Sequence, residues 1–190
     1  MTRIIGGTAG GRRLRTPAGE STRPTSDRVR EAMFSAIDSA LGSLAGLRFL
    51  DLYAGSGAVG LEARSRGAGV VTLVEQDRRT AALIHDNVKA LRLSGVEVTV
   101  GPVSRTLAQP PRAPYDVVFL DPPYALPTPV VVDDLRALVV QDWLAHQALV
   151  VVERSTRSPE LTWPEGLSAV RSRKYGETTL WYGHADSPPA

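Results

Sequence analysis

The segment from residue 49 to residue 60 constrains the fold most, because it joins an apolar run to a glycine turn and then to a helical stretch. It reads FLDLYAGSGAVG, and Gly55 and Gly57 carry the turn. Glycine at these positions allows tight backbone geometry and lets backbone amides approach a ligand without an intervening Cβ. A strand that runs through such a turn into a helix is the opening unit of an α/β fold.

The remainder of the chain continues this alternation. Helices are predicted over residues 26–41, 59–66, 78–93 and 132–143 from their apolar spacing. Strands are predicted over residues 48–53, 70–74, 96–100, 115–120 and 148–153, with two more over 167–182 around Tyr175-Gly176. The pattern predicts a doubly wound, Rossmann-like α/β fold with a mostly parallel seven-stranded sheet and an antiparallel edge hairpin.

Charge is distributed unevenly along the chain. Residues 1–30 contain seven Arg against only Glu20 and Asp27, whereas the remaining residues contain fifteen Lys and Arg against eighteen acids. A basic segment attached to a mildly acidic body favours a polyanionic partner such as nucleic acid. We therefore expect an RNA-binding arm over residues 1–25, a catalytic domain over 26–186 and a disordered tail over 187–190.

Composition excludes several classes of protein. The chain has no Cys, which excludes disulfides and thiolate zinc sites and fits a reducing compartment. The N-terminus lacks a secretory apolar stretch, and no apolar run approaches the roughly 18 residues that span a bilayer. The three His, at positions 85, 146 and 184, show no metal-ligand spacing. We expect a cytoplasmic monomer without a metal or a membrane partner.

Two acids near the glycine turn predict a nucleoside-containing ligand. Asp51 lies four residues before Gly55, where it can receive the ammonium group of a methionine moiety; a pyrophosphate in the same place would be repelled. Glu75 follows the apolar strand 70–74 and can accept both ribose hydroxyls of an adenosine. Glu75 does not distinguish NAD from S-adenosylmethionine, whereas Asp51 favours S-adenosylmethionine.

A second cluster of polar groups follows the strand 115–120, in the order Asp121-Pro122-Pro123-Tyr124. The strand delivers Asp121 to the carboxyl edge of the sheet, where α/β proteins bind ligands. The prolines fix the backbone, so the Asp121 carboxylate and the Pro122 carbonyl can accept hydrogen bonds from the two hydrogens of an –NH2 group. Tyr124 offers a ring on which a base can stack.

These motifs together resemble the amino-methyltransferases of the Rossmann-like class. The beginning of the chain makes the resemblance more specific: RIIGG at residues 3–7, Gly11-Arg12, and RPTSDRVREAMF at residues 23–34 are similar to the RsmD family. This resemblance covers nearly the whole chain. It implies transfer of a methyl group from S-adenosylmethionine to the 2-amino group of a guanine in 16S ribosomal RNA, within the small subunit or an assembly intermediate.

The resemblance also assigns roles to residues. The expected cofactor-binding residues are Asp51, Tyr53, Gly55, Gly57, Glu75 and Val103, of which Val103 departs from the Asp or Asn of many relatives. The expected catalytic residues are Asp121, Pro122, Pro123 and Tyr124. The charge of the arm, and not the resemblance, selects the expected RNA-binding residues Arg3, Arg12, Arg13, Arg15, Arg23 and Arg28. Arg23 and Arg28 could instead tie the arm to the core, and a competing possibility is that Ile4, Ile5 and Leu14 pin the arm to the core. Residues 1–22 of the arm are expected to contribute nothing to the glycine turn, to Glu75 or to the Asp121–Tyr124 segment.

Other functions remain open at this stage. The same chemistry could act on DNA adenine or on a protein glutamine, although no added target-recognition domain is evident. The fold could also belong to a non-catalytic RNA-binding assembly factor, but the intact Asp121–Tyr124 sequence argues against that. An NAD-dependent oxidoreductase is the least favoured, because no catalytic Tyr-Lys or His-Asp set follows the glycine turn.

Overall fold

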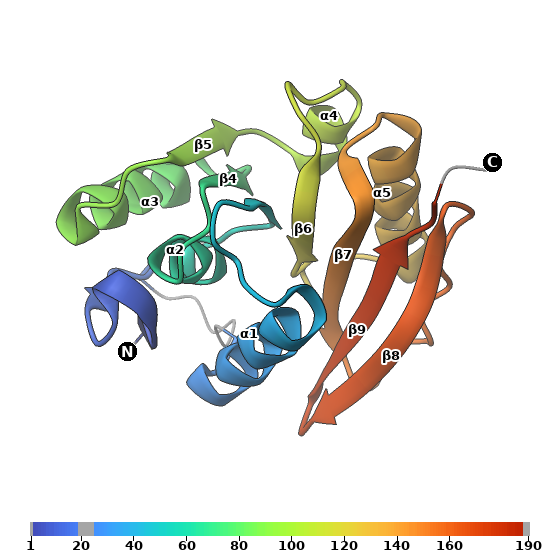
Figure 1. Cartoon of the computed structure of the whole chain (residues 1–190), viewed down its shortest axis with the longest axis horizontal. Helices are drawn as coiled ribbons and strands as arrows, with labels where there is room; N and C mark the ends of the chain where they lie inside the picture. Colours follow the sequence, from blue (N-terminus) through green and yellow to red (C-terminus); the bar gives the residue numbers. More distant parts are fainter. Residues whose placement is uncertain (1, 19–24, 188–190) are drawn as a thin grey trace.

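The computed structural model describes residues 2–18 and 25–187, and within them it contains a central seven-stranded sheet (Figure 1). The strand order is β5-β4-β3-β6-β7-β9-β8. The five strands β5, β4, β3, β6 and β7 run parallel, whereas β9 is antiparallel to both β7 and β8. Their bounds are β3 Arg48–Leu52, β4 Val70–Glu75, β5 Val96–Val100, β6 Tyr115–Leu120, β7 Leu144–Ser155, β8 Leu167–Tyr175 and β9 Thr178–Ala185. The predicted parallel sheet with an antiparallel edge hairpin is confirmed.

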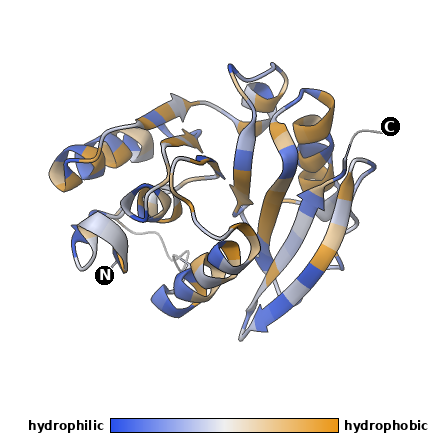
Figure 2. Cartoon of the chain, viewed as in Figure 1, coloured by the Kyte–Doolittle hydropathy of each residue, from blue (hydrophilic) through white to orange (hydrophobic). Residues whose placement is uncertain are grey.

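Helices cover both faces of this sheet. They are α1 Asp27–Leu41, α2 Ala58–Ser65, α3 Arg78–Leu91, α4 Val103–Leu107 and α5 Thr128–Val140. One buried cluster joins α1, α2 and α3 to one face through residues such as Phe34 and Ile84. The other cluster joins α4 and α5 to the opposite face through residues such as Leu107 and Leu135. In Figure 2 strand β7, in the interior of the sheet, is largely hydrophobic and the C-terminal half of β8 is mostly hydrophilic, as expected for a doubly wound sheet whose hairpin lies at the edge.

The larger differences from the sequence-based expectation concern α5, α4 and β7, whereas the other boundaries shift by no more than three residues. Helix α5 begins at Thr128 rather than 132, because Pro129 is tolerated in the first turn of a helix. The short helix α4 was not predicted, since five residues carry too little periodicity. Strand β7 begins at Leu144 rather than 148, because Leu144 pairs with Tyr115 ahead of a register shift between Tyr115 and Val117.

The described part of the N-terminal arm is folded against α2 and α3. Strands β1 (Thr2–Arg3) and β2 (Arg13–Leu14) pair antiparallel, and a 3₁₀ turn, η1 (Gly7–Ala9), lies between them. Ile4 and Leu14 are buried in a cluster that also contains residues of α2 and α3. Gly7 has a φ of +76°, and a Cβ there would lie 1.9 Å from the carbonyl oxygen of Ser65, so only glycine allows this close approach.

Candidate active site

The glycine turn leads from β3 into α2 at the carboxyl edge of the sheet. Gly57 precedes the helix in the left-handed conformation, with a φ of +83°. A Cβ on Gly57 would lie 3.1 Å from a Leu73 methyl and 3.2 Å from an Ile84 methyl, so the turn is packed tightly on the core. Gly55 has a φ of +56°, and a Cβ on it would meet no heavy atom within 4 Å, which leaves its backbone open to the cleft above the sheet.

Asp51 is buried beneath this turn. Its Oδ2 accepts a hydrogen bond from the Gly60 amide at 2.8 Å, and the residue is only 1% exposed. Burial raises the pKa of Asp51 well above its usual range; the Gly60 amide opposes this shift and the negative charge of Glu75 adds to it. Asp51 also lines the cleft, so an ammonium group placed there would stabilise its ionised form.

Glu75 connects the end of β4 to the glycine turn. Its Oε2 accepts from the Gly55 amide and its Oε1 accepts from the Asp77 amide, each at 2.9 Å. Each carboxylate oxygen has two lone pairs, so both oxygens can still accept a hydroxyl. The sequence did not predict that Glu75 also orders the glycine turn.

Tyr53 and Val103 reach the same cleft from different elements. The Tyr53 hydroxyl donates to Asp134 of α5. Burial raises the pKa of Tyr53 above its ordinary value, and the Asp134 carboxylate raises it further. Tyr53 has a φ of +61°, a left-handed conformation uncommon for a residue other than glycine. Val103 is buried at the start of α4 and lines the cleft together with Glu75.

The Asp121–Tyr124 segment follows β6 at the neighbouring strand end. The Asp121 amide donates to the Leu52 carbonyl at 3.3 Å, and Tyr124 is 55% exposed. Burial raises the pKa of Asp121 well above its usual range, the negative charges of Glu153 and Asp51 raise it further, and Arg154 opposes the shift. The Asp121 carboxyl group is therefore buried close to two other carboxyl groups, which favours its protonated form.

Two functional candidates were not predicted from the sequence, Glu153 and Arg154 at the end of β7. Arg154 is 3% exposed and donates to the carbonyl oxygens of Pro123 at 3.4 Å and Leu126 at 2.8 Å. Glu153 is buried and accepts from the Thr25 hydroxyl at 2.6 Å. A charged pair directly after the apolar run 148–152 was the available signal, by the same reasoning that selected Asp121.

One cleft of about 1140 Å³ brings the predicted residues together. All of the predicted cofactor-binding residues except Gly57 line it, as do all four predicted catalytic residues. The arm also lines it, through Thr2, Thr16, Pro17, Ala18 and Thr25. The expectation that the arm contributes nothing to the glycine turn, Glu75 or the Asp121–Tyr124 segment is therefore wrong, because the folded arm forms part of the same wall.

The arginines of the arm differ in their surroundings. Arg12 donates to the Leu91 carbonyl at 3.1 Å and to the Ala90 carbonyl, so it caps the C-terminal end of α3. Arg3 pairs with Asp27 at 3.1 Å and Arg15 with Asp86 at 3.6 Å. The side chains of Arg13 and Arg28 are exposed and make no ion pair with any described residue. Arg23 lies outside the described residues.

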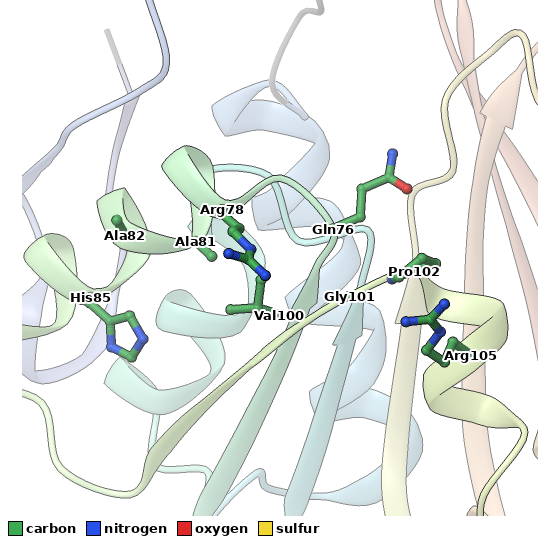
Figure 3. Close-up of a pocket in the computed structure, with 9 residues that line it drawn as sticks. All are labelled: Gln76, Arg78, Ala81, Ala82, His85, Val100, Gly101, Pro102 and Arg105. Atoms are coloured by element: carbon green, nitrogen blue, oxygen red, sulfur yellow. The ribbon is translucent and has the colours of Figure 1, made fainter.

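A second, smaller hollow of about 600 Å³ lies between α3 and α4, beside the edge strand β5 (Figure 3). Its lining includes Arg78, His85, Val100 and Arg105. Gln76 lines both this hollow and the larger cleft. It contains none of the motif residues. The chemistry therefore belongs to the larger cleft.

Residues 2–18 and 25–187 show neither a metal cluster nor a membrane-spanning helix. Within these ranges no three His, Asp or Glu side chains gather in a way that could hold a metal ion. None of the helices described there is both long and apolar enough to cross a membrane.

The strand order, the glycine turn and the acids at three adjacent strand ends define the Rossmann-like methyltransferase class of α/β proteins. The model of the family described as conserved hypothetical protein 95 matches residues 2–184. The chain belongs to this family, the RsmD family.

Individual relatives agree with this assignment. The chain is 35% identical over 175 residues to "Ribosomal RNA small subunit methyltransferase D" of Escherichia coli K12, covering 92% of this chain and 85% of that protein. The corresponding Haemophilus influenzae protein is 35% identical over 177 residues, covering 92% and 89%. The solved structure of "Putative methyltransferase yhhF from Escherichia coli" has a TM-score of 0.87 and 32% identity, covering 98% of this chain and 99% of that chain.

Proposed function

We propose that this protein transfers a methyl group from S-adenosylmethionine to the 2-amino group of a guanine in small-subunit (16S) ribosomal RNA. The observation that carries the proposal is the single cleft lined by Asp51, Glu75, Asp121 and Tyr124. The printed names of the relatives support a small-subunit ribosomal RNA substrate. The Asp121–Tyr124 segment supports an exocyclic amine as the acceptor.

The residues of the cleft fit S-adenosylmethionine. Asp51 is a buried carboxylate whose pKa is raised and which would be stabilised by the cofactor's ammonium group. Glu75 would accept the ribose hydroxyls, and Val103 would pack against the adenine. Gly55 leaves its backbone open to the cleft, which suits close approach of the methionine portion. When bound, the cofactor supplies an electrophilic methyl group on a sulfonium.

The target base would be held by the Asp121–Tyr124 segment. Tyr124 is exposed and offers a face for stacking, which is worth roughly 1–3 kcal/mol per base. The Asp121 carboxylate would accept one N–H of the amine and the Pro122 carbonyl the other. The Pro123 carbonyl already accepts hydrogen bonds from Arg154 and from the Leu126 amide. The acceptors that remain for the amine are the Asp121 carboxylate and the Pro122 carbonyl, which together form an amine clamp.

An aryl amine is a weak nucleophile because its lone pair is shared with the ring. Acceptors on both hydrogens favour a pyramidal nitrogen and direct the lone pair toward the electrophile. The nitrogen becomes acidic only as the new N–C bond forms, and Asp121 is placed to hold the departing proton. We assign Asp121 mainly the role of orienting the amine.

The proposal extends to the partner and the arm. We propose that residues 1–25 contact RNA, with Arg13 and Arg28 as the most available cations, and that residues 26–186 form the catalytic domain. Arg3, Arg15 and Arg23 remain candidates for phosphate contacts, whereas the α3 cap gives Arg12 a structural role. We propose that the protein acts as a monomer in the cytoplasm, on the small ribosomal subunit or its assembly intermediate.

Incubation with labelled S-adenosylmethionine tests this function, followed by mass spectrometry of nucleosides from the nucleic acids and of peptides from the proteins. The substrates to compare are naked 16S ribosomal RNA, small-subunit particles that lack the modification, duplex DNA and a mixture of ribosomal proteins. The expected product is N2-methylguanosine in one of the two RNA samples. Methyladenine in DNA, methylglutamine in protein, or no product in any sample would contradict the proposal.

A further inference from the structure

Asn87 of α3 makes three hydrogen bonds that join two separate parts of the proposed active site. Its Oδ1 accepts from the Arg15 amide at 2.8 Å, and its Nδ2 donates to the Arg15 carbonyl at 3.0 Å. The same Nδ2 donates to the Ser56 carbonyl, inside the glycine turn, at 3.1 Å. The residue is 2% exposed, so these bonds are shielded from water.

The two segments joined by Asn87 both border the cleft. Ser56 lies between the two glycines of the turn and lines the cleft. Arg15 is followed directly by Thr16, Pro17 and Ala18, which line another part of the same wall. A shift of the Asn87 side chain would therefore disturb the cofactor turn and the arm wall together.

Other contacts hold the arm without touching the glycine turn. Glu62 of α2 is fully buried and accepts from the Ile5 and Gly6 amides, each at 2.8 Å. The hydroxyl of Ser65, also on α2, donates to the Gly6 carbonyl at 2.6 Å and accepts from the Ala9 amide at 2.9 Å. Asn87 therefore differs from these anchors, because it alone among the three reaches the turn.

We propose that Asn87 is a positioning residue that couples cofactor binding to the docking of the N-terminal arm. This inference rests on the proposed cofactor and extends the proposed function to how the site is organised. Ordering the glycine turn around a ligand fixes the Ser56 carbonyl, which fixes the Asn87 amide and, through it, Arg15. Because one buried side chain contacts both segments, ordering either segment reduces the conformational entropy that is lost when the other becomes ordered.

Hydrogen–deuterium exchange on the full chain tests the coupling, with S-adenosylhomocysteine as the ligand. The probes are the Ile5 and Gly6 amides, because both bond to Glu62 and neither touches Asn87. In the wild type, saturating S-adenosylhomocysteine should slow their exchange by about 5-fold or more, the lower end of typical coupling between sites. In Asn87→Ala the ligand should slow it by less than about 2-fold, at a ligand concentration that saturates the variant.

Ser65→Ala is the matched control. It removes two arm contacts from α2 but leaves the link to Ser56 intact, so exchange without ligand should accelerate while the ligand-dependent slowing remains. Asn87→Asp provides a second variant, since it keeps the acceptor for the Arg15 amide and loses both donated bonds; it should also lose the slowing. All variants are compared at a temperature at which circular dichroism shows them folded.

The outcomes distinguish failure of the coupling through Asn87 from failure of the proposed function. Binding of S-adenosylhomocysteine by calorimetry without slowing at Ile5 and Gly6 in the wild type overturns the coupling and leaves the proposed function in place. Equal slowing in the wild type and Asn87→Ala, or its loss in Ser65→Ala as well, removes the specific role of Asn87. Absence of any binding to the wild type overturns both proposals.

Discussion

Arg154 of β7 donates a hydrogen bond from its Nη2 to the carbonyl oxygen of Leu126, in the loop between β6 and α5, at 2.8 Å. Its Nη1 also reaches the Pro123 carbonyl. A guanidinium presents its donors in a rigid fork, so one buried side chain fixes both sides of the turn that contains Tyr124. Arg154 of β7 thus anchors the backbone around Tyr124 by hydrogen bonds, and Pro122 and Pro123 restrict the same backbone further.

Replacing Arg154 should therefore reduce turnover more than cofactor affinity. We expect Arg154→Ala to lower kcat by up to roughly 100-fold, the scale of a small misplacement of reacting groups. Arg154→Lys should recover only part of this loss, because an ammonium cannot reproduce the fork. Arg157→Ala, at an exposed position in the turn just after β7, serves as the control and should leave kcat unchanged. Steady-state kinetics with calorimetry on the cofactor measures both quantities, and equal kcat in the Ala and control variants would refute the role.

Replacing Asp121 tests the amine clamp directly. Asp121→Ala should cut kcat sharply and leave the affinity for S-adenosylmethionine near normal, because the clamp acts on the base and not on the cofactor. Asp121→Asn should retain more activity than Asp121→Ala, since its amide oxygen still accepts a hydrogen bond. Single-turnover methylation of the RNA substrate measures the effect. A wild-type rate in Asp121→Ala would show that the clamp is wrongly assigned.

The environment of Asp121 predicts how methylation depends on pH. Its pKa is raised, and the carboxylate accepts from the amine more strongly than the protonated form and can also take up the departing proton, so the rate should rise with pH as the group deprotonates. Glu153→Gln removes a neighbouring negative charge while keeping an acceptor for Thr25, so the rising limb should move to lower pH. A pH–rate profile of both proteins gives the comparison, and an identical limb in the two would argue against control by this pair.

The same shift affects stability with a defined sign. In the folded state Asp121 binds its proton at pH values where the unfolded carboxyl, with a pKa of about 3.9, has lost it. The contribution of Asp121 to the free energy of unfolding is therefore greatest at low pH and falls as pH rises from the unfolded toward the folded pKa. Asp121→Asn should flatten this dependence in urea titrations run at several pH values; an unchanged slope would contradict the raised pKa.

Glu75 offers a test of the cofactor site. Glu75→Ala should weaken S-adenosylmethionine binding by roughly 1.5–3 kcal/mol, the scale of losing hydrogen bonds to a charged group. Glu75→Gln should lose less, because one oxygen remains to accept from the Gly55 amide or a ribose hydroxyl. Calorimetry distinguishes the variants. Wild-type affinity in Glu75→Ala would rule out the predicted ribose contact.

The arm arginines separate into two groups that should respond differently. Arg13→Glu should lower RNA affinity and reduce the log–log salt slope by about 0.7–0.9 if one phosphate contact is lost, with little change in Tm. Arg12→Glu should instead lower Tm, because Arg12 caps the carbonyls at the end of α3. Binding titrations at several salt concentrations and thermal melts provide both readouts. Unchanged RNA affinity at low salt in Arg13→Glu would remove this residue from the interface.

The sequence by itself determined the order of the main strands and helices along the chain, although not α4, together with the glycine turn and the acids at the ends of β3, β4 and β6. These features depend on local periodicity and on backbone sterics, which a few neighbouring residues specify. Because parallel strands end at a common edge, Asp51, Glu75 and Asp121 could be assigned to one site from their positions in the sequence, and all three line the same cleft.

Only the tertiary structure decided how the arm, Asn87, Glu153 and Arg154 take part. Asn87 bonds to a residue 72 positions away, and Arg154 to one 28 positions away. No local pattern selects one such partner among many, because these contacts exist only after helices and strands have packed. The arm appeared in the sequence as a basic segment, and its folded hairpin became part of the cleft because Ile4 and Leu14 bury their side chains against α2 and α3.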